Sequence, residues 1–349
     1  MMRRLIFLLP LFATTLGYAQ LTSENNERLR QGLKKYPAAD ADKDGILTLE
    51  EARAYLAKNK KSEVVKPKRG SPRPDFAEVA YGEHERNRLD LYLAKGMQGP
   101  TPVVVLIHGG GFNHGDKSEW VNDKALQELL SQGVSCAAIN YPFIEHMPIQ
   151  DILHHCARSV QFLRSKADEW NLDKTRFAAM GESAGAGTSL WLATRDDLAD
   201  RRSKDPVLRE SSRLVCAVCN APQATYDISR WEAFLGPSKP KYSTQGTEAA
   251  MFYHLASTQD FLTETGKAIL RECDMLSWIT KDDPPLLLGN SIVVKAPRNR
   301  GQWLHCIQHA REIRKKCEEG NVSCIVLQDQ PEIKTDAAQF LLVNLFPSM

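Results

Sequence analysis

RFAAMGESAGAG, residues 176–187, joins a strand pattern to a helix pattern through a sharp glycine turn. The apolar run 176–180 is typical of a buried strand, and the small residues after Ser183 are typical of a tightly packed helix. Between them, residues 181–185 (GESAG) fit G-x-S-x-G, whose glycines let the chain turn sharply. We therefore expect the Ser183 hydroxyl to project above the carboxyl edge of a sheet, where it could act as a nucleophile.

Strand and helix patterns alternate on both sides of this motif. Strands are predicted at residues 78–81, 89–93, 103–108, 134–140, 176–180, 214–219, 285–289 and 323–328. Helices are predicted at residues 123–130, 152–170, 190–195, 304–319 and 335–345. Such alternation predicts an α/β fold with a mostly parallel, doubly wound sheet, in which the first two strands form an antiparallel hairpin at one edge.

A second glycine motif follows the predicted strand at residues 103–107. It reads HGGGF, residues 108–112, and three consecutive glycines leave the backbone N–H groups free to converge. We expect Gly110 and Gly111, together with Ala184, to supply the backbone donors of an oxyanion hole. A tight turn or a phosphate-binding loop would also use glycines, but neither explains the paired GESAG motif, and no P-loop or dinucleotide fingerprint is present.

These motifs resemble the HGGG-containing esterases of the hormone-sensitive-lipase type. The resemblance is carried by HGGGF, by NYPFIEH at residues 140–146 and by GESAG, and it extends over about residues 76–223. Within that group the chain is most similar to bacterial feruloyl or acetyl-xylan esterase-like proteins. The resemblance implies the α/β-hydrolase fold, Ser183 as nucleophile, and a small ester or acylated carbohydrate as substrate.

The usual order of the other catalytic residues is broken in this chain. In such enzymes an acid follows the seventh strand and a histidine follows the eighth. Here Asn290 and Ser291 follow the strand predicted at residues 285–289, so an amide holds the place of the acid. No histidine follows the strand predicted at residues 323–328.

His305 is the best candidate for the base, because we expect it to start the helix after the loop of the seventh strand. Asp329 or Glu332, in the loop after the eighth strand, would then orient the ring, since triads are defined by geometry rather than by chain order. The alternative is a hydrolase fold that has lost its base and binds an ester, a sugar or a peptide without turnover. No cofactor is expected for the catalysis itself.

DADKDGILTLEE, residues 40–51, fits the twelve-residue EF-hand calcium loop. The expected Ca²⁺ ligands are the side chains of Asp40, Asp42, Asp44 and Glu51, the carbonyl of Ile46, and a direct or water-bridged contact from Thr48. Because a solitary hand lacks its usual partner, binding should be weak. We expect this segment to stabilise the protein or to dock it on a partner at the cell surface; a calcium-dependent adaptor with an inert large domain is a third hypothesis.

The chain is predicted to contain four segments. Residues 1–19 have the charged start, apolar run and small-x-small end of a signal peptide, which predicts a secreted or periplasmic protein. The others are the EF-hand segment at residues 23–58, a basic, proline-rich linker at residues 59–75, and the hydrolase domain at residues 76–349. About residues 220–283 of that domain form an insertion or cap.

Composition excludes some classes of protein. The 349 residues are 42% hydrophobic and 25% charged, which is typical of a globular protein with a sizeable core. A formal net charge of +2 gives no reason to expect a nucleic-acid partner. We expect most of the eight cysteines to be buried small hydrophobes or structural bridges, and we expect Cys216 and Cys219 to face opposite sides of a strand.

Overall fold

The structure is a computed structural model that describes residues 22–59, 64–237 and 251–347. It divides into two compact units, Met1–Asn59 and Lys60–Met349. The predicted signal peptide, residues 1–19, lies outside the described residues.

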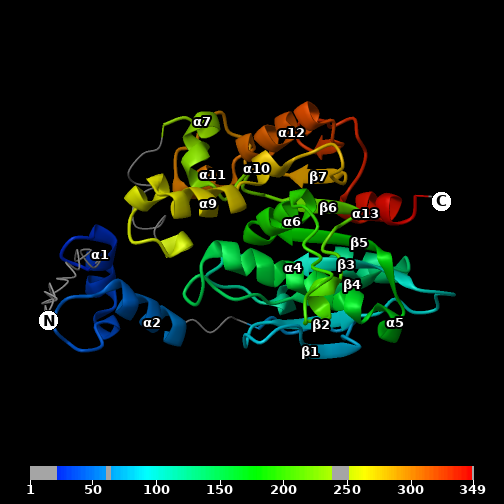
Figure 1. The fold of residues 1–349 in the computed structure, drawn as a ribbon, viewed down its shortest axis with the longest axis horizontal. Helices are drawn as coiled ribbons and strands as arrows, with labels where there is room; N and C mark the ends of the chain where they lie inside the picture. Colours follow the sequence, from blue (N-terminus) through cyan, green and yellow to red (C-terminus); the bar gives the residue numbers. More distant parts are fainter. Residues whose placement is uncertain (1–21, 60–63, 238–250, 348–349) are drawn as a thin grey trace, which may run out of the picture. The chain divides into compact units, whose positions relative to one another are not determined.

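The large unit is built on an eight-stranded sheet in the order β1-β2-β4-β3-β5-β6-β7-β8. Figure 1 labels β1 to β7, with β1 at the bottom of the view and β7 near the top. The strands are β1 (Phe76–Ala80), β2 (Arg88–Tyr92), β3 (Thr101–Ile107), β4 (Ser135–Ile139), β5 (Leu172–Glu182), β6 (Cys216–Asn220), β7 (Leu286–Gly289) and β8 (Cys324–Val326). β2 pairs antiparallel with β1 and β4, and every other pairing is parallel. The predicted sheet with an antiparallel hairpin at one edge is confirmed.

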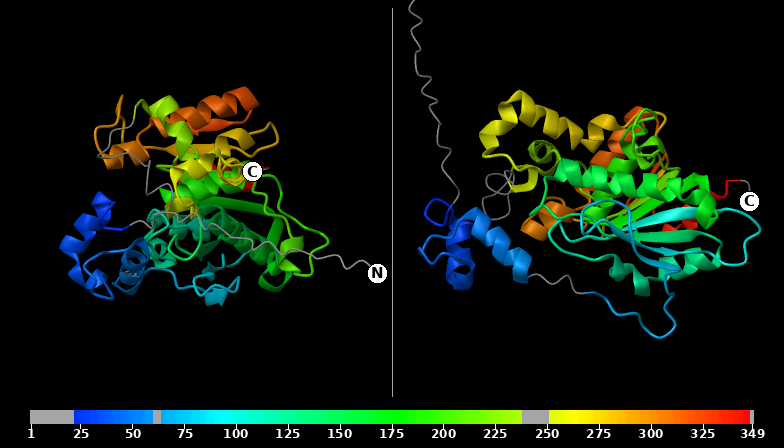
Figure 2. Two further views of the ribbon diagram at one scale, coloured as in Figure 1. Left: turned by 60° about the vertical axis from the view of Figure 1, so that its left-hand side comes forward. Right: turned by 60° about the horizontal axis from the view of Figure 1, so that its bottom comes forward.

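Helices cover both faces of the sheet (Figures 1 and 2). α3 (Lys124–Ser131) and α13 (Ala337–Leu345) pack on one face, against side chains such as Val104 and Leu106 of β3. The other face, which includes Val103 and Val105, is covered by α4 (Ile149–Ser165), α6 (Ala184–Thr194) and α12 (Gln308–Gly320). Because alternate side chains of a strand point to opposite faces, the continuous apolar run of β3 is buried on both.

Shorter helices lie in the connections. They are α5 (Ala167–Trp170), α7 (Trp231–Leu235), α9 (Glu264–Glu272), α10 (Met275–Trp278), α11 (Arg300–His305) and the 3₁₀ helices η2 (Lys117–Asn122), η3 (Val207–Arg209), η4 (Ile228–Arg230) and η5 (Thr258–Leu262). The helix predicted at residues 304–319 is thus two helices, α11 and α12, interrupted at Cys306. His305 therefore ends a helix, whereas the sequence predicted that it would start one.

The described parts of the insertion predicted at residues 220–283 lie against the rest of the large unit. The Phe252 ring is 5.8 Å from the ring of Phe112, which follows the three glycines. His254 Nε2 lies 2.6 Å from the carbonyl oxygen of Ile144. The Trp231 and His309 rings meet at 4.9 Å. These aromatic side chains therefore pack against the domain beneath them.

The small unit is a helix-loop-helix. It consists of α1 (Glu27–Lys35), η1 (Pro37–Ala39) and α2 (Leu49–Asn59), and its core is formed by Leu29, Ala39 and Leu47. α1 begins at Glu27, because the Asn26 side chain caps it by accepting a hydrogen bond from the Leu29 N–H.

All eight cysteines lie in the described part of the chain and all are free. Cys216 and Cys219 are buried on opposite faces of β6, as predicted, and belong to different core clusters. Of the residues described, none form a helix long and apolar enough to span a membrane.

Candidate active site

Ser183 lies at the corner between β5 and α6. Its backbone angles, φ 52° and ψ −114°, are unusual for a residue with a side chain and cost about 1–3 kcal/mol. Two contacts hold this corner. The Ser183 N–H donates to the Asn220 carbonyl at 2.9 Å. A Cβ added to Gly185 would lie 2.0 Å from the Ile107 oxygen, so only glycine allows α6 to approach β3 this closely.

The structure brings Ser183 and His305 together. The distance from Ser183 Oγ to His305 Nε2 is 2.7 Å, which is a hydrogen bond. Burial lowers the pKa of the His305 imidazole below its ordinary value, while a backbone hydrogen bond with Gly301 and the nearby Glu182 carboxylate act in the opposite direction. A proton on Nδ1, toward Gly301, leaves Nε2 free to accept the hydroxyl proton, as a general base must.

Asp329 is not brought to this ring. Both of its carboxylate oxygens accept hydrogen bonds from Arg311, at 2.8 and 2.7 Å, and within the described residues no hydrogen bond joins it to His305. Glu332 is exposed. Asn290, immediately after β7, instead donates a hydrogen bond from Nδ2 to the His305 carbonyl at 2.8 Å. In the described part of the chain, therefore, neither of the two predicted carboxylates orients the His305 ring.

The glycine loop lies directly beside the serine. A Cβ added to Gly109 would be 3.6 Å from Ser183 Cβ. Gly110 has φ 102°, and a Cβ there would overlap His114 at 1.9 Å, so this position requires glycine. Within the described chain no hydrogen bond occupies the N–H of Gly110 or of Gly111. Ala184 is the first residue of α6, and a first-turn N–H has no acceptor within its helix.

The loop rests on residues to which the sequence assigned no role. The Tyr141 hydroxyl donates to the carbonyls of His108 and Gly109 at 2.8 and 3.0 Å, and its ring stacks on His108 at 4.2 Å. Arg86 donates to the Gly115 carbonyl at 3.0 Å. Burial lowers the pKa of His108 to about 3, so this ring is neutral and structural. The sequence signal that could have identified Tyr141 as a support of the glycine loop is the NYPFIEH run, which contains it.

Comparison with known proteins places this geometry in a family. The family model BD-FAE matches residues 89–291, which include the glycine loop and Ser183. The chain belongs to the BD-FAE family. Its sheet order and helical layers are those of the α/β-hydrolase fold.

Curated relatives of this BD-FAE family chain are esterases by name. A probable isoprenylcysteine alpha-carbonyl methylesterase of Arabidopsis thaliana is 31% identical over 136 residues, covering 39% of this chain and 28% of the relative. A versiconal hemiacetal acetate esterase of Dothistroma septosporum is 26% identical over 187 residues, covering 52% of this chain and 51% of the relative. The matches therefore span about a quarter to a half of those proteins.

Solved structures show the same fold at low identity. A truncated carbohydrate esterase from gut microbiota superposes with a TM-score of 0.59 at 15% identity, covering 75% of this chain and 89% of that one. An acetyl ester-xyloside bifunctional hydrolase of Caldicellulosiruptor lactoaceticus gives a TM-score of 0.53 at 17% identity, covering 80% and 97%.

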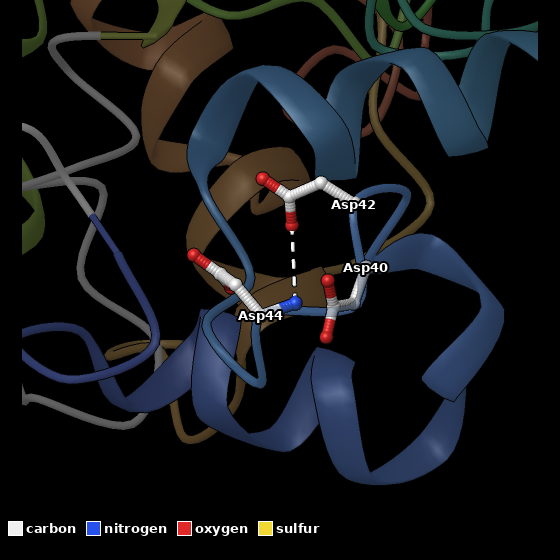
Figure 3. Close-up of side chains that lie close together, drawn as sticks. All are labelled: Asp40, Asp42 and Asp44. Atoms are coloured by element: carbon white, nitrogen blue, oxygen red, sulfur yellow. Dashed lines mark hydrogen bonds between the residues drawn. The ribbon is translucent and has the colours of Figure 1, made fainter.

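The BD-FAE family chain also carries an acidic loop in its small unit. The carboxylates of Asp40, Asp42 and Asp44 converge, with one oxygen of each within 4.8 Å of the others (Figure 3). Asp40 Oδ2 accepts a hydrogen bond from the Gly45 N–H at 2.9 Å, but Asp40 Oδ1 is buried and has no hydrogen-bond partner among the residues that the structure describes. Glu51 reaches back across the loop and accepts from the Ala41 N–H at 2.9 Å.

An N-terminal segment pairs with this loop where a second hand would usually do so. Thr22 and Thr48 form an isolated antiparallel bridge. Beside it, the Ser23 N–H donates to the Leu47 carbonyl at 2.8 Å, and the Leu47 N–H donates to Ser23 Oγ at 3.0 Å. Both backbone groups of Leu47 are therefore satisfied within the small unit.

Proposed function

We propose that the chain hydrolyses carboxylic esters through an acyl-serine intermediate. The observation that carries this proposal is the 2.7 Å contact between Ser183 Oγ and His305 Nε2, beside the unoccupied N–H groups of Gly110 and Gly111. A fold that had lost its base would not present an imidazole nitrogen to the serine hydroxyl. The names of the curated relatives support the same class of reaction.

The reaction divides into two steps. Ser183 Oγ attacks the ester carbonyl carbon while its proton passes to His305 Nε2, and the resulting oxyanion is bound by the N–H groups of Gly110, Gly111 and Ala184. The C–O bond to the alcohol then breaks, and His305 returns the proton to the departing oxygen. Water repeats the sequence on the acyl-serine, which releases the acid and restores the Ser183 hydroxyl.

Small acyl groups on carbohydrate are the proposed substrates. The two structural neighbours, a carbohydrate esterase and an acetyl ester-xyloside hydrolase, support this choice, as does the resemblance of the motifs.

Hydrolysis of p-nitrophenyl acetate tests the reaction. The account predicts that Ser183→Ala and His305→Gln each lose nearly all turnover. Ser131→Ala and His154→Gln, which change exposed side chains on α3 and α4, should retain it. Equal rates for wild type and Ser183→Ala would overturn the proposal and favour a binding protein.

We propose a second function for the small unit, the binding of one calcium ion. The supporting observation is the buried, unpartnered Oδ1 of Asp40, since a buried acceptor without a partner is costly and a cation would satisfy it. Asp40, Asp42, Asp44 and Glu51 offer the carboxylate oxygens that Ca²⁺ prefers, with the predicted carbonyl of Ile46 and the oxygen of Thr48. The proposed role is stabilisation or calcium-dependent docking on a cell-surface partner.

Calorimetric titration of the full chain with CaCl₂ tests this site. We expect one site with a Kd of roughly 10⁻⁴ to 10⁻³ M, the range of extracellular modules. Glu51→Gln should weaken binding strongly, and Glu50→Gln, a change at the exposed neighbouring position, should not. No heat of binding at millimolar Ca²⁺, or equal binding by the two variants, would contradict the assignment.

We also propose that the protein is exported, either secreted or periplasmic. Support comes from the sequence of residues 1–19 alone. The mass of the protein recovered from outside the cytoplasm of its expressing host would show whether these residues are removed.

A further inference from the structure

The base of the proposed reaction sits on a very short helix. α11 contains six residues, and His305 is the last of them. A helix of this length has little stability of its own, and no N–H group of the helix donates a hydrogen bond to its final carbonyl groups. The position of the His305 ring therefore depends on what holds the C-terminal end of α11.

Three buried side chains hold that end by donating to consecutive carbonyl groups. His309 Nε2 lies 2.9 Å from the Trp303 oxygen, and Gln223 Nε2 donates to the Leu304 oxygen at 3.0 Å. Asn290 Nδ2 donates to the His305 oxygen at 2.8 Å and to the next carbonyl, that of Cys306, at 3.4 Å. Asn290 and His309 are 0% exposed, and Gln223 is 6% exposed.

These donors connect α11 to the edge of the sheet that carries Ser183. Gln223 follows β6 and Asn290 directly follows β7. The edge itself is tied together, because the Ser183 N–H donates to Asn220 of β6 and the Ala221 N–H donates to Gly289 of β7. Hydrogen bonds thus connect both the nucleophile and the base to the carboxyl ends of β6 and β7.

Asn290 acts in this arrangement as a donor. An aspartate at the same place, when ionised, has no hydrogen to donate and would set negative charge against the carbonyl oxygens of His305 and Cys306. This position costs free energy, since Asn290 Oδ1 is buried without a hydrogen-bond partner in the described structure. Such an unsatisfied group calls for a reason, and holding the base supplies one.

We infer that Asn290, assisted by Gln223 and His309, is a positioning residue that fixes His305 through the backbone of α11. The amide after β7 therefore has a function of its own and is not a catalytic acid lost by mutation. This inference rests on the proposed ester hydrolysis. It predicts that Asn290→Asp lowers the activity. If Asn290 were only a catalytic acid lost by mutation, restoring the aspartate should raise the activity.

The test compares Asn290→Asp with Asn299→Asp on p-nitrophenyl acetate. Asn299 caps the N-terminus of the same helix by accepting from the Gln302 N–H, a role that a carboxylate fills equally well. We expect Asn290→Asp to lower kcat on the order of 100-fold at about pH 8, the size of effect caused by a misplacement of about 1 Å, with KM within threefold. Asn299→Asp should keep the kcat of the wild type.

Acid should partly rescue the first variant. A protonated aspartic acid regains one O–H donor, so the ratio of the Asn290→Asp rate to the wild-type rate should rise as the pH falls from about 8 to about 5.5. Asn290→Ser, which keeps a shorter neutral donor, should lie between the two. A kcat for Asn290→Asp equal to or above that of the wild type at pH 8, or a pH-independent ratio, would overturn the inference.

A second measurement separates this inference from the proposed reaction. If Ser183→Ala and wild type hydrolyse the ester equally, the reaction is wrong, but the His305 ring can still be followed by its ¹⁵N NMR signal, assigned by its loss in His305→Gln. In Asn290→Ser the His305 pKa should move up toward 6.5, because a loosened α11 exposes the ring to water. An unchanged pKa would overturn the inference without reference to activity.

Discussion

Ser183 keeps its strained backbone only because the residues around it leave no alternative. Gly185 brings α6 against the Ile107 carbonyl at the end of β3, and Gly109 lies against the serine from the other side. The strain is local, and the close packing of three elements sustains it. This combination aims the hydroxyl at both the imidazole and the glycine loop.

Gly185→Ala tests this packing. The added methyl would lie 2.0 Å from the Ile107 oxygen, so α6 must shift away from β3. We expect kcat/KM to fall on the order of 100-fold and the unfolding free energy to fall by about 1–3 kcal/mol. Gly99→Ala, where no atom lies within 4 Å of the added carbon, is the control and should match the wild type in both. Retained activity in Gly185→Ala would contradict the described geometry.

The pH dependence of kcat/KM tests His305 as the base. Only the neutral ring can accept a proton, and burial lowers its pKa, so the neutral form persists below the ordinary value. Activity should therefore fall on acidification with an apparent pKa below 6.5. Glu182→Gln removes a carboxylate that raises this pKa and should move the limb to still lower pH. An apparent pKa of kcat/KM above 6.5, or a shift of this pKa to higher pH in Glu182→Gln, would count against this assignment.

At the scale of single elements, the sequence predicted which strands and helices exist better than it predicted where each one begins and ends. Every predicted strand of the sheet is present, because apolar runs between turn residues report burial directly. The break at Cys306 was not predicted, since it depends on the Asn290 and Gln223 side chains that terminate α11. Those partners are distant in sequence, and no local pattern encodes them.

The same limit applies to the site. Ser183 and the glycines were found from local motifs whose spacing carries the chemistry. His305 was chosen because it was expected to start the helix after the loop of the seventh strand. It ends α11 instead, and its ring still forms a hydrogen bond with Ser183. Asp329 was selected by its place after β8, but the side chain of Arg311 takes both of its oxygens. An ion pair between two elements leaves no trace in a single sequence.

Ser23 gives an element-scale prediction for the small unit. Its hydroxyl accepts from the Leu47 N–H, so Ser23→Ala leaves a buried donor unsatisfied, at a cost of about 1–3 kcal/mol. We expect weaker calcium binding in the same calorimetric titration. Thr22→Ala, whose hydroxyl accepts an exposed 3.3 Å hydrogen bond from the Glu24 N–H, should bind nearly as the wild type does. Equal affinity for Ser23→Ala and wild type would show that this segment does not support the loop.

At the scale of the whole molecule, two buried histidines link stability to pH. Burial lowers the pKa of His108 to about 3 and that of His309 to about 4. The unfolded chain binds protons near pH 6.5 while the folded chain does not, so stability is full above that pH and is lost as the pH falls. At pH 5 the loss should be about 2 kcal/mol for each histidine.

Urea unfolding at pH 7.5 and pH 5 measures this loss. His309→Gln keeps a donor and an acceptor but cannot titrate, so its stability should depend less on pH, by about 2 kcal/mol over this interval. Ser131→Ala, a change at an exposed position that carries no titrating group, should retain the full dependence. The same pH dependence in His309→Gln as in the wild type would contradict a buried neutral ring.

The sheet, the glycine loop and α11 together make one claim, that Ser183 is an activated nucleophile. The most direct measurement is to label the full chain with a fluorophosphonate, digest it and locate the adduct by mass spectrometry. The account predicts an adduct on Ser183 in the wild type and little or none in His305→Gln. An adduct on another serine, or labelling of Ser183 that is unchanged in His305→Gln, would contradict it.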